Sequence, residues 1–271
     1  MSMLSDFNLT GKEYQNRKPF PHMYMDNFLD KDFAKKVQEE IMALPNEMFD
    51  RYNNPFEDKY TLRDKYNYPP NLNKLMEMLE TDEFVGKVSD LVGYKLIKDP
   101  NRNFWGVHKY EPGDKLDIHV DAGLHPVTKE KKQVTLGIYL SYNWKEDNGC
   151  CLEIWKGDNA KHNDAKLYER VAKIPPMFNR LIIFTCDDYS WHGNPEPVES
   201  QDPSSRRIFV TLSYLSHNYK DQNKRQKAYF VARPLDVPDE EKDKLRLLRA
   251  DPEKYKEVYR YKNKKVNDSG Y

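Results

Sequence analysis

The apolar positions in the first third of the chain repeat with the period of an α-helix. Residues 19–29 have the pattern of a strand that leads into a helix start, which Asp30 or Asp32 can cap. The apolar residues that follow share one helical face: Phe33, Ala34, Val37, Ile41 and Leu44. Pro69-Pro70-Asn71 opens a second helical pattern that continues for another turn or two to Val92; its apolar residues include Leu72, Leu75, Met76 and Leu79. Both stripes predict helices that face the core.

After Tyr94 the pattern changes to that of β-strands. The runs rich in β-branched and aromatic residues are 104–110, 133–141, 151–155, 180–185 and 206–215, and clusters of Gly, Pro, Asn and Asp separate them. Because no helix-length pattern lies between these runs, the sheets are expected to be antiparallel, as in a sandwich or barrel. The polar, tyrosine-rich stretch 50–68 shows no clear period.

The chain turns helical again near its end. Residues 238–249 are heavily charged and carry a thin apolar stripe, which predicts a solvated terminal helix and not a nucleic-acid arm. We expect residues 1–271 to form a single domain. Within it, 1–100 would give helical support, 101–218 the catalytic core and 219–271 a C-terminal extension.

Composition narrows the class of protein. Hydrophobic residues make up 38% of the 271 residues, and the 13% of aromatic residues can still bury a sizeable core. The 44 basic and 44 acidic residues cancel, so no global positive field exists to recruit nucleic acid. A nucleic-acid partner is therefore not expected.

The cysteines and the N-terminal residues indicate the cellular compartment in which the protein is expected. Cys150, Cys151 and Cys186 are too few for a disulfide framework, which predicts buried free thiols in a reducing environment. The first eight residues lack the basic and apolar regions of a secretory signal, and no window approaches 18 apolar residues. These observations predict a soluble cytoplasmic protein without a membrane span.

The first candidate for chemistry is a histidine and a carboxylate two residues apart. In an extended chain His119 and Asp121 point to the same face, so an imidazole and a carboxylate would lie side by side. His162 and Asp164 have the same spacing, but they lie in the polar run 157–166, which is typical of a solvated loop. The sequence therefore favours the pair at His119.

A metal site needs a further donor. The remaining histidines are His22, His108, His125, His192 and His217. His192 follows the apolar strand 180–185 and precedes a Gly-Asn-Pro turn, which places it at a rim. Two imidazoles and one carboxylate on one face of an ion form the facial triad of non-haem Fe(II) oxygenases. His119, Asp121 and His192 are the candidate triad.

The surrounding segments resemble a known family. Residues 110–121 resemble the Tyr-Pro-Gly run that leads into the His-x-Asp motif of Fe(II)- and 2-oxoglutarate-dependent dioxygenases of the prolyl 4-hydroxylase type. Residues 135–154 are similar to the next strands, although Cys150 replaces the second glycine of the usual pair. Residues 174–184 with His192, and 207–213, are similar to the last strands. The resemblance covers about 104–216, and 19–29 also fits.

The resemblance implies a fold and a set of ligands. The fold is a double-stranded β-helix (jelly roll, cupin-like), mainly β, with N-terminal helices packed on the outer face of one sheet and a short C-terminal helix. Iron would be held by His119, Asp121 and His192. Arg207 would pair with the distal carboxylate of 2-oxoglutarate, because a guanidinium matches a carboxylate bidentately. Arg206, its neighbour, is the alternative.

Other residues have implied positions in the same site. Tyr139 matches the family's cosubstrate tyrosine. Thr211 shares a strand face with Arg207 and could add a hydroxyl beneath the carboxylate. Tyr110, Trp105 and Trp191 are candidates to line the substrate pocket, with a place in the core as the alternative. The resemblance implies no catalytic residue beyond the metal ligands.

The implied activity is hydroxylation of an unactivated C–H bond. O2 and 2-oxoglutarate would be consumed, succinate and CO2 released, and ascorbate is a candidate stimulant. Related halogenating enzymes have a small residue in place of the triad carboxylate, so Asp121 implies hydroxylation. The substrate would be a peptidyl-prolyl-type residue or a small molecule. Two alternatives stay open: a cupin-like metal-binding module or isomerase without 2-oxoglutarate turnover, and a catalytically inactive scaffold.

Two segments lie outside the shared core. They are the tyrosine-rich stretch 50–68, and residues 227–234 with the charged helix that follows. Each could form a cap over the substrate or simply pack on the barrel.

Overall fold

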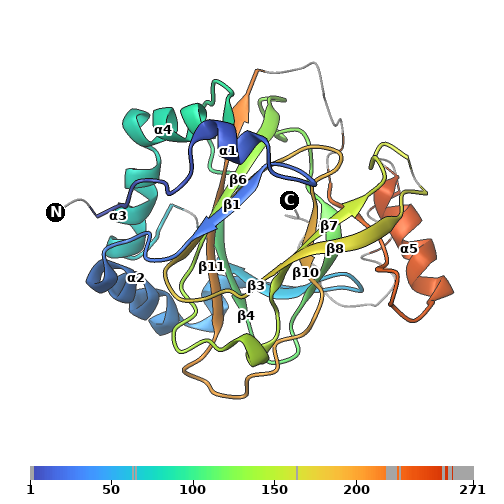
Figure 1. The fold of residues 1–271 in the computed structure, drawn as a ribbon. Helices are drawn as coiled ribbons and strands as arrows, with labels where there is room; N and C mark the ends of the chain where they lie inside the picture. Colours follow the sequence, from blue (N-terminus) through green and yellow to red (C-terminus); the bar gives the residue numbers. More distant parts are fainter. Residues whose placement is uncertain are drawn as a thin grey trace.

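Two antiparallel sheets form the body of the protein in a computed structural model, which describes residues 3–62, 64, 66–162, 164–217, 225, 227–251, 254–255 and 258. The double-stranded β-helix predicted for the core is confirmed, with few helices around it. Figure 1 shows helices α2, α3 and α4 on one side of the barrel and α5 on the opposite side. No helix in the described part of the chain is both long enough and apolar enough to cross a membrane.

The helices begin where the sequence supplies caps. The helices are α1 (Gly11–Gln15), α2 (Lys31–Ala43), α3 (Pro70–Leu79), α4 (Asp82–Val92) and α5 (Glu240–Ala250), with 3-10 turns at Asn46–Met48 and Glu146–Asn148. Of the two predicted caps for α2, Asp30 is the one used: its side chain accepts from the Phe33 amide. The second helical pattern is interrupted, because the Thr81 side chain caps a new helix at the Phe84 amide. One expected helix is therefore two.

The larger sheet has seven strands. Its order is β1 (His22–Met25), β9 (Arg180–Thr185), β6 (Lys131–Tyr139), β11 (Arg207–Ser216), β4 (Gly106–Tyr110), β3 (Asp58–Leu62) and β2 (Phe49–Asn53). The tyrosine-rich stretch without a period thus contains a hairpin, β2–β3, that extends this sheet. The sequence did not predict it, because both faces of the hairpin carry polar residues.

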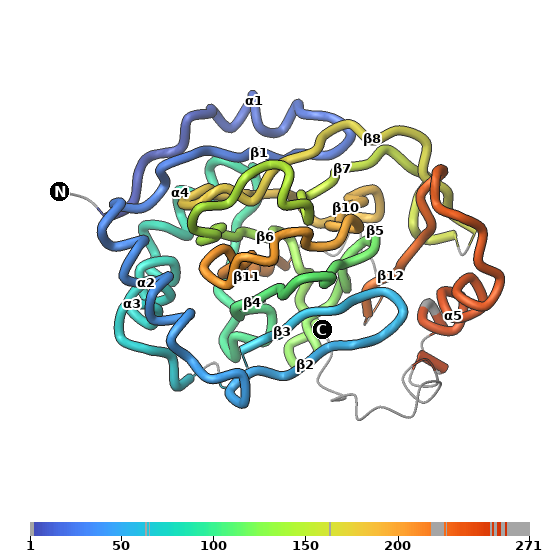
Figure 2. The backbone as a smooth tube through the Cα atoms, turned by 90° about the horizontal axis from the view of Figure 1, so that it is seen from below, coloured from blue at the N-terminus to red at the C-terminus, as the bar shows by residue number. Residues whose placement is uncertain are grey.

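The smaller sheet has five strands and faces the larger one. Its order is β12 (Tyr229–Phe230), β5 (Leu116–Val120), β10 (Trp191–Asn194), β7 (Leu152–Gly157) and β8 (Leu167–Ile174). Strands β8 and β10 were not predicted. Strand β8 is exposed along most of its length and so lacks the alternation of a half-buried strand, and β10 has only four residues. Figure 2 shows β12 beside β5, on the side of the barrel where α5 lies.

Alternation along the central strands sorts side chains between two environments. Val134, Leu136, Ile138, Val210 and Leu212 belong to the hydrophobic cluster that also contains the buried faces of α2, α3 and α4. Residues between them, such as Thr135, Phe209 and Thr211, point into the interior of the barrel. At Gly137 a Cβ atom would lie 2.0 Å from the Phe209 ring, so glycine lets this ring lie flat on β6.

Helix α5 is less solvated than its sequence predicts. Its thin apolar stripe is present, but Leu245, Arg246 and Arg249 are buried. Leu245 packs in a cluster with Phe56 and Phe230, so the helix covers the edge of the barrel next to β12. The charged sequence of α5 did not predict this contact with the barrel, because two of the three buried side chains are arginines, which are usually exposed.

Asn179 joins the N-terminal segment to the barrel and provides a test of the fold. Its side chain accepts from the Leu29 amide at 2.8 Å and donates to the Leu29 carbonyl at 2.7 Å, while its own φ is 60°. We expect Asn179→Ala to lower the free energy of unfolding by about 3–5 kcal/mol, since it removes two buried hydrogen bonds and strains a left-handed residue. Urea unfolding measures this loss.

Two controls separate the contributions. Asn179→Gly keeps the left-handed backbone and should be about 1 kcal/mol less damaging than alanine. Asn143 also has a positive φ, of 53°, but its side chain is exposed. Asn143→Ala should therefore lower the free energy of unfolding only by the strain of a left-handed alanine. Equal losses at both positions would show that the Leu29 hydrogen bonds add nothing.

Candidate active site

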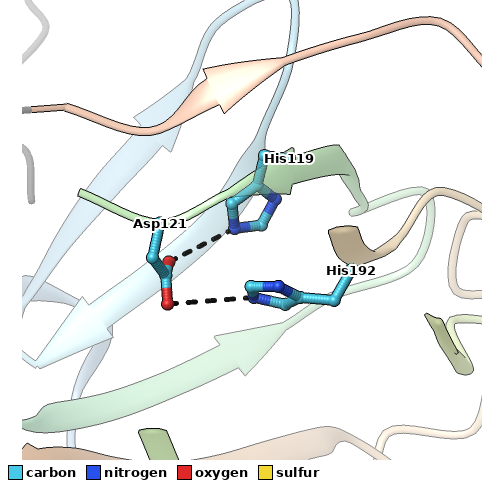
Figure 3. Close-up of side chains that lie close together, drawn as sticks. All are labelled: His119, Asp121 and His192. Carbon is cyan, nitrogen blue, oxygen red and sulfur yellow. Dashed lines mark ion pairs between the residues drawn. The ribbon is translucent and has the colours of Figure 1, made fainter. Parts of the chain in front are cut away.

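The three predicted metal-binding side chains converge. His119 on β5 and His192 on β10 are register partners on neighbouring strands, and their ring centroids lie 4.5 Å apart. Asp121 follows β5 directly. Its carboxylate oxygens lie 3.6 Å from His119 Nε2 and 3.9 Å from His192 Nε2. One donor atom from each residue lies within 4.8 Å of the others, and Figure 3 shows all three side chains pointing to a common centre.

Backbone carbonyls fix the orientation of both imidazoles. His119 Nδ1 lies 2.9 Å from the Asp117 carbonyl oxygen, and His192 Nδ1 lies 2.8 Å from that of Ser190. A carbonyl oxygen can only accept, so each Nδ1 carries the proton and each Nε2 presents a lone pair to the centre. Burial and the neighbouring His119 lower the pKa of His192 to about 4, which keeps its ring neutral at pH 7.

Asp121 is held in its ionised form by a buried lysine. Lys132 Nζ lies 2.7 Å from Asp121 Oδ2, and the Thr135 hydroxyl donates to the same oxygen at 3.3 Å. Burial opposes ionisation, but the Lys132 ammonium and the two imidazoles lower the pKa of Asp121 well below its usual range. Sequence analysis did not identify Lys132, because its Lys-Glu-Lys-Lys run is typical of a solvated surface.

The triad lies in the wall of a cavity of about 120 Å³ between the two sheets. Arg207, Phe209, Thr211 and Ser213, which alternate along β11, all line it, as do Tyr139 and Tyr110. Burial raises the pKa of the Tyr139 phenol, so it remains a hydrogen-bond donor. The Thr211 hydroxyl donates to the Leu136 carbonyl at 3.3 Å.

Arg207 is a buried cation with hydrogen-bonding capacity left over. The residue is 2% exposed. Its Nε donates to the Cys150 carbonyl at 3.0 Å and one terminal nitrogen donates to Asn194 Oδ1 at 3.3 Å. The other terminal nitrogen, Nη1, has no hydrogen-bond partner among the described residues. Its guanidinium carbon lies 4.4 Å from the Tyr110 ring centroid, so aromatic contact partly compensates its burial.

A buried guanidinium of this kind is an anion-binding group. Its two defined hydrogen bonds go to neutral oxygens, and removing a charge from water without a counter-charge is costly. A carboxylate that entered the cavity would supply both the missing charge and the missing acceptor. Asn194 holds the guanidinium in place; it stands two residues after His192 on β10, a spacing from which it could have been found in the sequence.

Several other residues from the sequence lie outside this cavity. Trp105 is buried in the main core, and the Trp191 indole donates to the Asp158 carbonyl at 2.8 Å within a separate cluster. Arg206 pairs with Glu111 on the other face of β11. His162 and Asp164 are exposed, as the loop composition predicted.

Of the remaining histidines, only His108 lines the cavity among the described residues. His22 contacts the Phe20 carbonyl, His125 contacts Asp99, and His217 lies near Glu130. His108 does line the cavity. Burial and the nearby cations lower its pKa well below the usual range, so it is neutral.

Both segments outside the predicted core reach the cavity. Glu57 and Lys59 from the β2–β3 hairpin line it, as do Phe230 of β12 and Arg249 of α5. The Phe230 ring lies 5.1 Å from the His119 ring and stacks on Phe56 at 4.9 Å. Of the two alternatives for these segments, forming the cap is therefore favoured over packing alone.

The residues present fit an iron ion and 2-oxoglutarate. Two imidazole nitrogens and a carboxylate on one face are the donor set that non-haem Fe(II) sites use. The protonated Nδ1 atoms leave the correct nitrogens for a metal, and Arg207 offers an unpaired donor in the same cavity. The arrangement can hold a metal ion and a dicarboxylate together.

Comparisons with known proteins agree with this chemistry. Residues 105–215 match the family model described as the 2OG-Fe(II) oxygenase superfamily. Among curated proteins, none matches the sequence.

Solved structures show the same fold at low identity. A prolyl-4-hydroxylase from Pseudomonas putida is 13% identical, with a TM-score of 0.54 over 76% of this chain and 98% of the other. A prolyl hydroxylase from Trichoplax adhaerens, in complex with a peptide from the oxygen degradation domain of hypoxia inducible factor, is 19% identical. Its TM-score is 0.57 over 77% of this chain and 88% of the other.

The matched residues include all three converging ligands and Arg207. Members of this superfamily use Fe(II), 2-oxoglutarate and O2. Residues 105–215 therefore match the 2OG-Fe(II) oxygenase superfamily, and the chain has the fold of the prolyl hydroxylases.

Proposed function

We propose that this protein is an Fe(II)- and 2-oxoglutarate-dependent oxygenase that hydroxylates an unactivated C–H bond of a peptide or small-molecule substrate and releases succinate and CO2. The observation that carries the proposal is that a facial His–Asp–His set and a buried arginine with an unpaired donor share one cavity. Within a single domain, 101–218 would act as the catalytic core and 1–100 as its support.

His119, Asp121 and His192 would hold the iron. When bound, the iron supplies the activation of O2 that is coupled to the oxidative decarboxylation of 2-oxoglutarate. The neutral His192 imidazole requires no deprotonation at pH 7, and ionised Asp121 contributes the negative charge that imidazole ligands lack. Lys132 keeps Asp121 ionised and limits the rotation of its carboxylate.

Arg207 would bind the distal carboxylate of 2-oxoglutarate, with the Tyr139 phenol and the Thr211 hydroxyl beside it. The guanidinium is already oriented by Asn194 and the Cys150 carbonyl, so little side-chain entropy is lost on binding. Ring faces of Phe104, Phe184 and Phe209 line the same cavity and exclude water from it.

The structure offers less support for the alternatives. A metal-binding module or isomerase without 2-oxoglutarate turnover would leave the buried charge of Arg207 without a use. An inactive scaffold would not require both Nδ1 atoms to be anchored so that both Nε2 atoms face the carboxylate. The proposed hydroxylation would use both the buried charge of Arg207 and the anchored imidazoles.

We infer a reducing compartment such as the cytoplasm. Cys150, Cys151 and Cys186 are all free and buried, and disulfides form in oxidising compartments. Burial also raises the pKa of Cys150 to about 11, so this thiol near the site is not a nucleophile at neutral pH.

The first prediction concerns the metal ligands. Alanine at His119, Asp121 or His192 should abolish tight Mn(II) binding, because each change removes a third of the protein donor set. Isothermal titration calorimetry with Mn(II) measures this without oxidation. His162→Ala, at an exposed loop position, is the control and should bind Mn(II) as the unaltered protein does. Unchanged affinity in His192→Ala would refute the assignment.

The second prediction concerns the cosubstrate. Arg207→Ala should raise the Kd for 2-oxoglutarate by more than about a hundredfold, since losing a buried charge partner costs roughly 3–5 kcal/mol. Titration of 2-oxoglutarate into the Mn(II)-loaded protein measures this, and Mn(II) binding should persist. Arg206→Ala is the matched control and should have little effect. If the control shows the large loss instead, the assignment on β11 is wrong by one residue.

The third prediction concerns the product. With its substrate, the enzyme should add one oxygen atom from O2 for each succinate released, and mass spectrometry under ¹⁸O2 detects the label. In chloride buffer the unaltered protein should give no chlorinated product, because Asp121 would serve as a ligand where halogenating enzymes have a small residue. Asp121→Gly should lose hydroxylation. A chlorinated product from the unaltered protein would contradict this prediction.

A further inference from the structure

Cys150 has a backbone conformation that favours glycine. Its φ is 47°, in the left-handed region, and Gly149 before it has a φ of 76°. An L-residue in this region is strained, because its Cβ lies too close to the following carbonyl oxygen. A strained residue persists only where the surrounding structure holds it, so the contacts of its side chain are informative.

The thiol of Cys150 is fully buried and lies between two polar groups. Its sulfur lies 3.0 Å from Asn194 Nδ2 and 3.9 Å from the Asp114 carbonyl oxygen. Burial raises the pKa of Cys150 to about 11, so the sulfur carries its proton at neutral pH. A carbonyl oxygen can only accept, so the thiol donates to Asp114 and accepts from the Asn194 amide.

The direction of the Asn194 amide is determined by Arg207. A guanidinium can only donate, so the amide oxygen must face it, and Asn194 Oδ1 accepts from Arg207 Nη2 at 3.3 Å. The amide nitrogen then points away from Arg207 and needs an acceptor, which the Cys150 sulfur provides. Asn194 is 3% exposed, so losing this acceptor would leave a buried donor unsatisfied.

Cys150 also contacts Arg207 through its backbone, which closes a ring of three hydrogen bonds. Arg207 Nε donates to the Cys150 carbonyl at 3.0 Å, Arg207 Nη2 donates to Asn194, and Asn194 Nδ2 donates to the Cys150 sulfur. Arg207 Nη1 stays outside the ring, without a partner among the described residues. The ring therefore sets the plane of the guanidinium and leaves one terminal nitrogen for a ligand.

The ring joins the two sheets at one end of the cavity. Arg207 begins β11 of the larger sheet, Asn194 ends β10 of the smaller sheet, and Cys150 lies just before β7, the neighbour of β10. The Arg207 side chain is therefore held from the opposite sheet, and its direction does not depend on its own strand alone.

We propose that Cys150 is a positioning residue for 2-oxoglutarate: its thiol orients the Asn194 amide, and this amide and the Cys150 carbonyl together orient Arg207. This inference rests on the proposed function, since it assumes that Arg207 binds the distal carboxylate. The thiol itself does not touch the cosubstrate. Bidentate pairing between a guanidinium and a carboxylate depends on direction, so a guanidinium that is free to rotate binds less tightly.

The alternative role for the thiol is to fill space. Cys150 belongs to a buried cluster with Tyr110, Trp144 and Val198, where its sulfur adds apolar contact. The two roles differ in what they predict for substitutions. Serine keeps a donor and an acceptor but is less apolar, alanine keeps the strain without the hydrogen bonds, and glycine removes both.

The test measures the Kd for 2-oxoglutarate by calorimetry in the Mn(II)-loaded protein. Cys150→Ala should raise this Kd about fivefold, as expected for the loss of a neutral hydrogen bond, while the Kd for Mn(II) stays within about twofold. Cys150→Ser should restore the Kd to within about twofold of the unaltered protein. If the unaltered protein does not bind 2-oxoglutarate, the result counts against the proposed function rather than against this inference.

A neighbouring thiol provides the matched control. Cys151 is also buried, but its sulfur lies 3.6 Å from the Gly149 carbonyl oxygen and not beside Asn194. Cys151→Ala should therefore leave the Kd for 2-oxoglutarate within about twofold of the unaltered protein. An equal rise in Cys151→Ala and Cys150→Ala would show a general effect of removing a buried thiol and would overturn the proposal.

Cys150→Gly separates positioning from stability. Glycine has no strain at this φ, so urea unfolding should find this variant at least as stable as Cys150→Ala, and it keeps the test usable if alanine does not fold. Its Kd for 2-oxoglutarate should nevertheless rise about fivefold, as in alanine. A Kd that follows the order of stabilities, or a serine variant as weak as alanine, would show that the thiol only packs.

A double-mutant cycle tests the route of the effect. Asn194→Ala should raise the Kd for 2-oxoglutarate about tenfold, since it removes a hydrogen bond to a charged group. Because the thiol acts through Asn194, adding Cys150→Ala to this variant should weaken binding no further. Losses that multiply in the double variant would show that Cys150 acts by another route and would refute the proposal.

Discussion

The alternation of side chains along β6 and β11 is the constraint on which both the core and the active site depend. One face of each strand packs against α2, α3 and α4, and the other face lines the cavity. A slip of one residue in β11 would bury Arg206 in the cavity and direct Arg207 to Glu111. Packing against the N-terminal helices therefore fixes the register that places Arg207, Thr211 and Tyr139 in the cavity.

Two carboxylates of the site are each buried beside a lysine, whereas Arg207 is buried without a charged partner among its defined hydrogen bonds. Asp121 has Lys132 and Glu57 has Lys59, and in each pair the lysine makes ionisation of the carboxylate favourable despite burial. Arg207 has only neutral partners among its defined hydrogen bonds. A buried charge without a counter-charge is costly, and under the proposed function a bound dicarboxylate would offset that cost, so that ligand binding and charge compensation would be the same event.

The shared core and the added segments contribute different parts of the enzyme. The matched residues 105–215 contain the three converging side chains of the candidate triad and Arg207. The hairpin β2–β3, strand β12 and helix α5 lie outside that range and close the cavity next to His119. Substrate selection is expected to reside in these segments, because they contribute Lys59, Phe230 and Arg249 to the lining.

Local patterns and motifs in the sequence were enough to predict the jelly-roll core, the helices packed on it and the candidate triad. Hydrophobic period and cap residues are local signals, and the spacing of His119 and Asp121 is local as well. The tertiary structure alone decided which cations enter the cavity. Lys59, Lys132 and Arg249 stand in charged runs that look solvated, and they are buried only because strands and a helix far apart in sequence close over them. Burial of a charge depends on a partner such as Asp121 or Glu57, and such long-range pairing leaves no local pattern.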